Sequence, residues 1–331
     1  MTDLCLVTGG GGFLGRYIVE QLLAAGRTVR IFSRGSYPEL QAAGVQICRG
    51  DLRDAAAVHA ACRDVSAVFH TAAVPGVWGP RDLYFGTNLE GTRNVLQACR
   101  NSRVQRLIYT SSPSVVFDGT DHVDADESLP YPRRWLCHYP HSKALAEQLV
   151  LQAADQQLRT VALRPHLIWG PRDNHLIPRL LEAARSGRLR QVGAGQNVVS
   201  VAYVENVAAA HLQAEQSLQR SHTISGRPYF INEPQAVNLW NWVSTLLQLG
   251  GLPPLRRRIS QRKAMLLGAF CEGLWTALPL PGEPPMTRFV ASQLAGSHSY
   301  SINAARRDFG YQPPLSMEAG LQRLKAAISR Q

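Results

Sequence analysis

A tyrosine and a lysine four residues apart are the residues of this sequence that most directly suggest chemistry. Tyr139 and Lys143 enclose Pro140-His141-Ser142, and a spacing of four places two side chains on one face of a helix. A phenol with its ordinary pKa of about 10 is a weak acid at neutral pH, but a neighbouring ammonium lowers that pKa. The pair is therefore a candidate general acid for a ketone, with the lysine also available to cofactor ribose hydroxyls.

The spacing alone does not identify a catalytic pair, because matches to it are frequent by chance. Lys143, Lys263 and Lys325 are the only lysines of the chain, so a lysine at this position is more informative than usual. A helix is expected over residues 142–154, and His141 is expected on its surface rather than as a second base.

A run of glycines near the start of the chain suggests a phosphate site. Gly9, Gly12 and Gly15 are spaced three apart, directly after an apolar run at residues 4–7 and before an amphipathic stretch at 13–25. Such a turn allows positive φ and a close backbone approach, and the following helix N-terminus favours an anion. A flexible turn would explain the glycines alone, but a turn between strand and helix predicts a dinucleotide pyrophosphate.

The next apolar run indicates which dinucleotide binds. Residues 28–32 form the expected second strand, which ends in Ser33 and Arg34. NAD sites usually place Asp or Glu here for the ribose 2′-hydroxyl, whereas an arginine suits the 2′-phosphate of NADP. The sequence therefore predicts NADP(H) rather than NAD(H); the alternative is that Arg34 is only a solvated loop residue.

The elements that must position these residues alternate in type along the first half of the chain. Short β-branched runs are separated by longer amphipathic ones, which predicts an α/β fold: a Rossmann-like, doubly wound parallel sheet. We expect an NADP-binding domain at residues 1–170 that carries the catalytic residues. A smaller, mostly helical substrate domain is expected at 171–331, with some strands returning to the sheet and helices near 177–186 and 203–217.

Composition narrows the classes of protein. Of the 331 residues, 45% are hydrophobic and 18% charged, with 35 Lys+Arg against 24 Asp+Glu for a net charge of +11. This excludes a disordered chain. The six cysteines are scattered without metal-site spacing, so no metal is expected. The arginines form no aromatic-interleaved stripe, so nucleic acid is not an expected partner. With no secretory signal pattern, and an apolar stretch at 264–280 too short to span a bilayer, a cytoplasmic protein is expected.

The order of the motifs resembles the extended short-chain dehydrogenase/reductase family over nearly the whole chain. The resemblance implies that Tyr139 is the general acid/base, that Lys143 activates it and that Asn88 completes a proton relay. It also implies a cofactor site, whose residues are Thr8, Gly9, Gly12, Phe13, Leu14, Gly15, Ser33, Arg34, Asp51, Leu52, Thr71, Ala72, Ala73, Tyr139, Lys143 and Pro165.

The resemblance also implies a serine that binds the substrate. By the same resemblance Ser112 donates a hydrogen bond to the substrate oxygen, at a distance from Val115 that favours it over Ser111 and Ser114. Pro113 follows it, where many relatives carry a small flexible residue, so the alternatives remain open.

The second half is similar to the 3β-hydroxysteroid dehydrogenase/isomerase branch, on residues 201–211, 226–232, 282–288 and 304–311. Residues 111–119 are similar to two groups within it: sterol-4α-carboxylate dehydrogenases and bacterial 2-alkyl-3-oxoalkanoate reductases of long-chain olefin synthesis. We expect NADPH-dependent, reversible reduction of a β-keto acid; the alternatives are a hydroxysteroid or sterol-carboxylate dehydrogenase and a non-catalytic NADP sensor. A nucleotide-sugar substrate is disfavoured by the apolar stretch, and a homodimer is expected.

A lipid-like substrate would need apolar walls and a group for its carboxylate. Arg172, His175 and Arg179 follow the sixth expected strand, and any of them could receive the carboxylate, with Arg172 and His175 preferred. The stretch 264–280 is expected to line a lipid pocket or a subunit contact, and three tryptophans are expected in loops bordering the site, although core packing is equally compatible with each: Trp78, Trp135 and Trp169. The basic residues at 256–263 suggest contact of segment 256–280 with a membrane or a partner enzyme.

Overall fold

The protein folds around a seven-stranded parallel sheet, as the alternating pattern predicts. The computed structural model describes residues 3–278 and 280–329. The sheet order is β12-β7-β5-β4-β1-β2-β3, and every adjacent pair is parallel. Its strands are β1 (Leu4–Thr8), β2 (Thr28–Ser33), β3 (Gln46–Arg49), β4 (Ala67–His70), β5 (Arg106–Thr110), β7 (Arg159–Pro165) and β12 (Arg227–Ile231).

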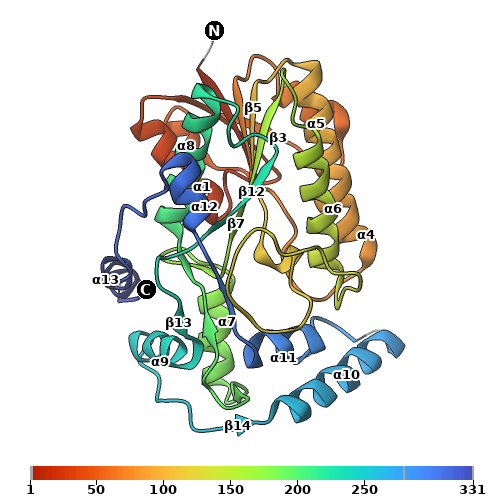
Figure 1. The fold of residues 1–331 in the computed structure, drawn as a ribbon, viewed down its shortest axis with the longest axis vertical. Coiled ribbons are helices and arrows are strands. Elements are labelled where there is room, and N and C mark those ends of the chain that lie inside the picture. Colours follow the sequence, from red (N-terminus) through yellow and green to blue (C-terminus); the bar gives the residue numbers. More distant parts are fainter. Residues whose placement is uncertain (1–2, 279, 330–331) are drawn as a thin grey trace.

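Helices cover both faces of this sheet, because successive strand residues point to opposite sides. In β1, Leu4 and Leu6 pack on one face and Cys5 and Val7 on the other. The first face carries α3 (Ala55–Ala61), α5 (Gly91–Asn101) and α6 (His138–Gln152); the second carries α1 (Phe13–Ala24), α8 (Val204–Arg220) and α12 (Asn303–Phe309). Figure 1 shows these two layers, with α5 and α6 on one side of the strands and α1 and α8 on the other.

The predicted doubly wound fold is confirmed, and its strand order fixes where a ligand can bind. Connections run outward in opposite directions from β1 and β4, so a crevice opens beyond their carboxyl ends. The expected helix at 142–154 begins four residues earlier than predicted, at His138. Tyr139 therefore lies in the first turn of the helix rather than before it.

The later part of the chain is mostly helical and lies beyond the carboxyl ends of the strands. Its helices are α7 (Leu176–Arg185), α9 (Leu239–Leu249), α10 (Gln261–Ala277), α11 (Arg288–Ala295) and α13 (Met317–Ile328). A four-stranded sheet joins β13 (Val237–Asn238), β10 (Val198–Val199), β15 (His298–Tyr300) and β6 (His122–Ala125). Two pairs complete it: β11 (Ala202–Tyr203) with β8 (Ile168–Trp169), and β14 (Arg258–Ile259) with β9 (Gln191–Val192). The short helices α2 (Pro38–Ala42) and α4 (Arg81–Tyr84) lie in the first half.

Trp169 belongs to the core of this later part, not to the border of the site. Its side chain is fully buried, and its ring packs against those of Tyr203 and Trp242. The expectation that Trp169 borders the site was therefore wrong, because large aromatic side chains contribute most when they fill a core. Trp78 and Trp135 do line a surface groove beside α6, which carries Tyr139 and Lys143 and is called the catalytic helix below.

Candidate active site

A cleft of about 590 Å³ lies at the carboxyl ends of the strands, where the topology predicts it. The glycine turn forms one wall, and the amino end of α6 forms another. With the exception of Thr8, every residue expected to bind the cofactor lines this cleft. Ser112 and His175 line it as well, whereas Asn88 and Arg172 do not.

The glycine turn has the tight geometry that a pyrophosphate needs. Gly9 has φ +70°, a conformation that other residues rarely adopt. A side chain at Gly15 would place its Cβ 2.2 Å from the carbonyl oxygen of Gly9. Helix α1 begins at Phe13 with no side-chain cap at Gly12, so its first amides face the cleft without a competing acceptor. The turn therefore fits a dinucleotide phosphate.

The residues at the end of β2 bring a positive charge to the cleft. Ser33 and Arg34 both line the cleft, with no carboxylate at either position. Asp51 also lines the cleft, but its carboxylate already accepts both Nε and Nη2 of Arg53, at 2.9 and 2.8 Å. These bonds to Arg53 hold the pKa of Asp51 down at about 2. The local charge available to a ligand here is thus the guanidinium of Arg34.

The three side chains that the sequence suggests for catalysis line the same cleft. Tyr139, Lys143 and Ser112 all line the cleft, and Tyr139 shares a hydrogen bond with Ser112. Ser111 also lines the cleft with a buried hydroxyl, whereas Ser114 does not line it. The bond to Tyr139 therefore favours Ser112 among the three serines.

The pKa of Tyr139 differs from the expectation that a neighbouring ammonium lowers it. Burial raises the pKa of Tyr139 to about 12, and the hydrogen bond from Ser112 acts against this rise. The Nζ of Lys143 donates to the backbone oxygen of Thr110 at 2.6 Å and lies 4.1 Å from the Tyr109 ring centre. Burial lowers the pKa of Lys143 to about 7, with Glu147 opposing that effect.

Glu147 is part of a buried ion pair that holds the catalytic helix. Its carboxylate accepts Nε and Nη2 of Arg164, at 3.0 and 2.6 Å, and the hydroxyl of Tyr131 at 2.6 Å. Because Arg164 belongs to β7, this bidentate pair fixes α6 against the sheet one turn after Lys143. Two contacts therefore position Lys143 in the cleft: its ammonium is bonded to Thr110, and its helix is held to the sheet by Glu147 and Arg164.

Thr8 and Asn88 lie behind the cleft and are joined by a chain of hydrogen bonds. The hydroxyl of Thr92 donates to the carbonyl of Asn88 at 2.6 Å, so it accepts from Nε2 of His70 at 3.0 Å. Nδ1 of His70 then accepts the hydroxyl of Thr8 at 2.7 Å, and that oxygen accepts the amide of Ala72 at 3.3 Å. Burial lowers the pKa of His70 to about 3, which keeps it neutral for this role.

The side-chain amide of Asn88 also has partners. It donates to Ser142 Oγ at 3.0 Å and exchanges bonds with the backbone of Val74, while lying in a π-helical turn at Phe85–Glu90. Asn88 thus ties the loop after β4 to the catalytic helix without lining the cleft.

The candidate carboxylate receptors are placed differently from one another. His175 lines the cleft just before α7. The guanidinium of Arg172 is held in two bonds to Glu20, at 2.6 and 2.8 Å, and Arg179 pairs with Glu283 at 3.2 Å. Of the three, His175 is the one that the fold brings into the cleft.

Sequence reasoning missed Tyr37, which also lines the cleft. Its ring covers the glycine turn so closely that a Cβ at Gly11 would lie 2.0 Å from it. No spacing rule connects an aromatic residue after β2 with the turn, so only the fold reveals the contact. His141, expected on the helix surface, is half-buried and lines the same surface groove as Trp135, on which it stacks with ring centres 5.2 Å apart.

Comparison with known proteins gives a consistent picture. The family model described as the 3-beta hydroxysteroid dehydrogenase/isomerase family matches residues 6–260. A 2-alkyl-3-oxoalkanoate reductase of Stenotrophomonas maltophilia (strain K279a) is 49% identical, covering 97% of this chain and 98% of that protein. A decarboxylating sterol-4-alpha-carboxylate 3-dehydrogenase of Mus musculus is 36% identical, covering 96% and 89%.

A solved structure agrees on the fold. MoeE5 in complex with UDP-glucose and NAD superposes with a TM-score of 0.74 at 26% identity, over 98% of each chain. The match to the family model extends from β1 into β14 and so includes the glycine turn, the catalytic helix and the first helices of the later part. The chain therefore belongs to the 3-beta hydroxysteroid dehydrogenase/isomerase family.

Proposed function

We propose that this oxidoreductase uses NADPH to reduce the ketone of a 2-alkyl-3-oxoalkanoic acid to the 3-hydroxy acid. The observation that carries the proposal is a single cleft that is lined by Tyr139, Ser112 and Lys143 and also by Ser33 and Arg34. Relatives named 2-alkyl-3-oxoalkanoate reductase, at 49% and 45% identity, support the substrate class.

The chain's own residues would supply the proton and the orientation. When bound, the nicotinamide would supply a hydride to the ketone carbon, and Tyr139 would donate its proton to the ketone oxygen. Ser112, already bonded to Tyr139, would hold that oxygen in place. Lys143 would hold the ribose hydroxyls of the cofactor next to the tyrosine, from the position fixed by Thr110 and Glu147.

A second candidate is the reverse reaction on a sterol carboxylate. Oxidation of a 3-hydroxy acid at the same residues, with oxidised nicotinamide as the hydride acceptor and Tyr139 taking the hydroxyl proton, would give a β-keto acid, which loses CO₂ readily. The relatives named sterol-4-alpha-carboxylate 3-dehydrogenase, decarboxylating, favour this alternative. A non-catalytic NADP sensor is disfavoured, because the chain retains Tyr139, Lys143 and Ser112 in one cleft. A homodimer in the cytoplasm remains our prediction for its state in the cell.

The decisive test compares the two substrate classes side by side. NADPH oxidation is measured with a racemic 2-alkyl-3-oxoacid and with a 3-ketosteroid at matched concentrations. We expect turnover with the oxoacid that exceeds the ketosteroid rate at least ~10-fold, because a carboxylate-binding site accepts only the former well. Turnover of the ketosteroid alone would overturn the proposed substrate.

Arg34 is expected to determine the choice of cofactor. Replacing Arg34 by Ala removes the charged partner of the 2′-phosphate, so kcat/KM for NADPH should fall by roughly 10- to 100-fold, as for a lost hydrogen bond to a charged group. The value for NADH should change little. Steady-state kinetics with both cofactors measure this, with Arg63→Ala, an exposed arginine outside the cleft, as the matched control. Equal losses for both cofactors would contradict the assignment.

His175 is proposed to receive the carboxylate of the substrate. His175→Ala should raise KM for a 3-oxo acid several-fold while leaving KM for its methyl ester nearly unchanged, because only the acid carries the charge. Arg172→Ala is the comparison variant, and we expect a smaller effect since Glu20 already engages its guanidinium. An equal rise for acid and ester in the His175 variant would discredit this role.

A further inference from the structure

Helix α10 presents an apolar face outward although its other face is firmly docked. On the inner face, Gly268 lies so close to Thr287 and Arg288 that a Cβ there would be 2.7 Å from their backbone. Glu272 accepts the amide and Nε of Arg288 at 2.7 and 2.6 Å. The helix is therefore held in a defined orientation, and its outer face is not simply a poorly packed core face.

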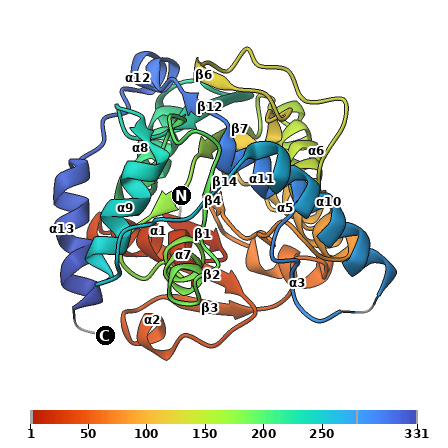
Figure 2. The ribbon, with the colours of Figure 1, turned by 90° about the horizontal axis from the view of Figure 1, so that it is seen from below.

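The outer face of α10 is unusually apolar. Leu266 is 72% exposed, Phe270 68% and Leu267 43%. These three positions, one turn apart or adjacent, lie on the same side of the helix. Figure 1 shows α10 along the lower margin of the molecule, and Figure 2, seen from below, shows it at the outer edge beside α11. A contiguous exposed group of large apolar side chains on a helix marks an interaction surface.

Basic side chains surround the amino end of this face. Arg262 and Lys263 begin α10, and the preceding segment 256–258 consists of three exposed arginines. The pairing of β14 with β9 brings residues 185–190 to the same end, where Arg257 Nη1 donates to the carbonyl of Gly187. Segments 185–190 and 256–270 together hold eight exposed Arg and Lys side chains and contain no Asp or Glu.

A groove next to α10 links this surface to the catalytic helix. The groove, of about 1090 Å³, is lined by Ala269, Gly273 and Ala277 of α10 on one side and by Trp135 and Leu136 on the other. It extends to Tyr84, whose ring centre lies 6.5 Å from that of Tyr139. An alkyl chain leaving a bilayer at α10 would thus meet an open groove that reaches the neighbourhood of the catalytic tyrosine.

We propose that the outer face of α10, with the basic residues around it, docks on an anionic lipid bilayer. Leu266, Leu267 and Phe270 would enter the interface between headgroups and acyl chains while the cations meet lipid phosphates. A protein partner would need a matching acidic and apolar surface, whereas a bilayer supplies both features at once. No helix within the described residues is long and apolar enough to cross a membrane, so this contact is an attachment to one surface. The benefit for substrate delivery rests on the proposed function, but the docking itself does not.

Vesicle co-sedimentation tests the docking without any enzyme assay. The full chain is mixed with two kinds of vesicle. One contains phosphatidylcholine alone, and the other contains phosphatidylcholine with about 30 mol% phosphatidylglycerol, which gives the surface a negative charge. We expect binding to the anionic vesicles, weakened at least ~10-fold in the double variant Leu266→Gln/Phe270→Gln. Arg262→Gln/Lys263→Gln should weaken it by about 30-fold, since each cation near such a surface contributes roughly fivefold.

Controls separate this proposal from its alternatives. Val123→Gln removes an equally exposed apolar residue, 70% exposed, from β6 at another part of the surface, and should leave vesicle binding unchanged. All variants should retain the wild-type melting temperature and wild-type turnover of a short-chain, water-soluble 3-oxo acid. Absent binding to anionic vesicles, or binding that both double variants retain, overturns the docking surface. Conversion of a dimer to a monomer by Leu266→Gln/Phe270→Gln would also overturn it, by assigning the face to a second copy. Absent turnover of every 3-oxo acid by the wild type overturns only the proposed function.

Discussion

Tyr139→Phe is expected to lower kcat for ketone reduction by roughly 10²- to 10⁴-fold, the range that a positioned general acid contributes. The substitution removes one oxygen atom and keeps the ring that packs near Tyr84. No proton donor is left on that ring at the end of the cleft where Ser112 and Lys143 converge. Because Lys143 is fixed on the carbonyl of Thr110, it does not replace the missing hydroxyl.

Two measurements distinguish this loss of chemistry from a loss of binding. Single-turnover oxidation of NADPH reports the hydride step, and quenching of protein fluorescence by NADPH reports cofactor affinity, which we expect to stay within about threefold of the wild type, since the glycine turn and Arg34 remain. Tyr84→Phe is the matched control, because its hydroxyl donates to the backbone of Trp78 at 2.9 Å and does not line the cleft. Turnover of Tyr139→Phe within about tenfold of the wild type would refute the assigned acid.

Local pattern and chain order determine those parts of the candidate site that the sequence could predict. The glycine turn between β1 and α1 needs a particular backbone at particular positions, so its spacing is visible in the sequence. Tyr139 and Lys143 share a helix, and their relation depends only on helical periodicity. Strand β2 ends in Ser33, and Ser112 follows β5; because both strands belong to one parallel sheet, their carboxyl ends lie at the same edge.

Long-range contacts explain what the sequence did not reveal. The direction of the Lys143 ammonium depends on Thr110 from another element, and the ion pair that engages Arg172 uses Glu20, 152 residues away. Trp169 became a core residue because Tyr203 and Trp242 come from distant segments. The early start of α6 reflects the packing of its first turn against Phe85 and Trp135, which no capping signal marks. Except for Trp135, each of these partners is remote in sequence.

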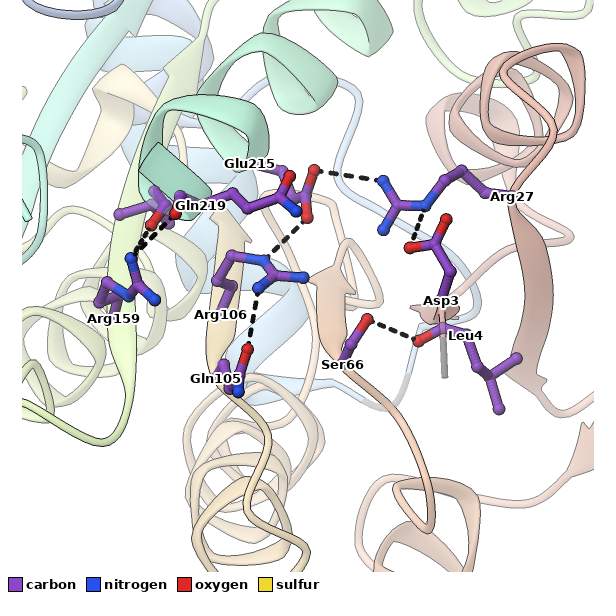
Figure 3. Close-up of polar contacts among 10 residues, drawn as sticks. Asp3, Leu4, Arg27, Ser66, Gln105, Arg106, Arg159, Glu215 and Gln219 are labelled. Atoms are coloured by element: carbon purple, nitrogen blue, oxygen red, sulfur yellow. Dashed lines mark hydrogen bonds and ion pairs between the residues drawn. The ribbon is translucent and has the colours of Figure 1, made fainter. Parts of the chain in front are cut away.

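Another expected result concerns the end of the sheet opposite the cleft, where a buried carboxylate joins two arginines. Glu215 of α8 is 1% exposed, and it accepts Nε of Arg106 at 2.8 Å and Nη1 of Arg27 at 3.4 Å. Arg27 also pairs with Asp3 at 2.6 Å, and Arg106 reaches Gln105 at 3.1 Å. Figure 3 shows this network around the amino ends of the strands, with Glu215 between the two guanidinium groups.

Glu215→Ala is expected to lower the free energy of unfolding by about 3–5 kcal/mol, because it leaves the charge of Arg106, only 5% exposed, without its counter-ion. Urea denaturation measures this change. The matched control is Glu39→Ala, which removes a carboxylate from an exposed pair with Arg16 and should cost no more than about 1 kcal/mol.

The double variant Arg106→Met/Glu215→Met separates the cost of an unpaired charge from the net value of the pair. Removing both charges and filling the space with apolar side chains should restore much of the lost stability, since breaking a buried pair costs more than replacing it. Because the network lies at the amino ends of the strands, the folded fraction of every variant should keep the wild-type kcat. If Glu215→Ala costs less than about 1 kcal/mol, or if the double variant is less stable than the single one, water must solvate Arg106 in the folded protein and the network does not hold α8 to the sheet.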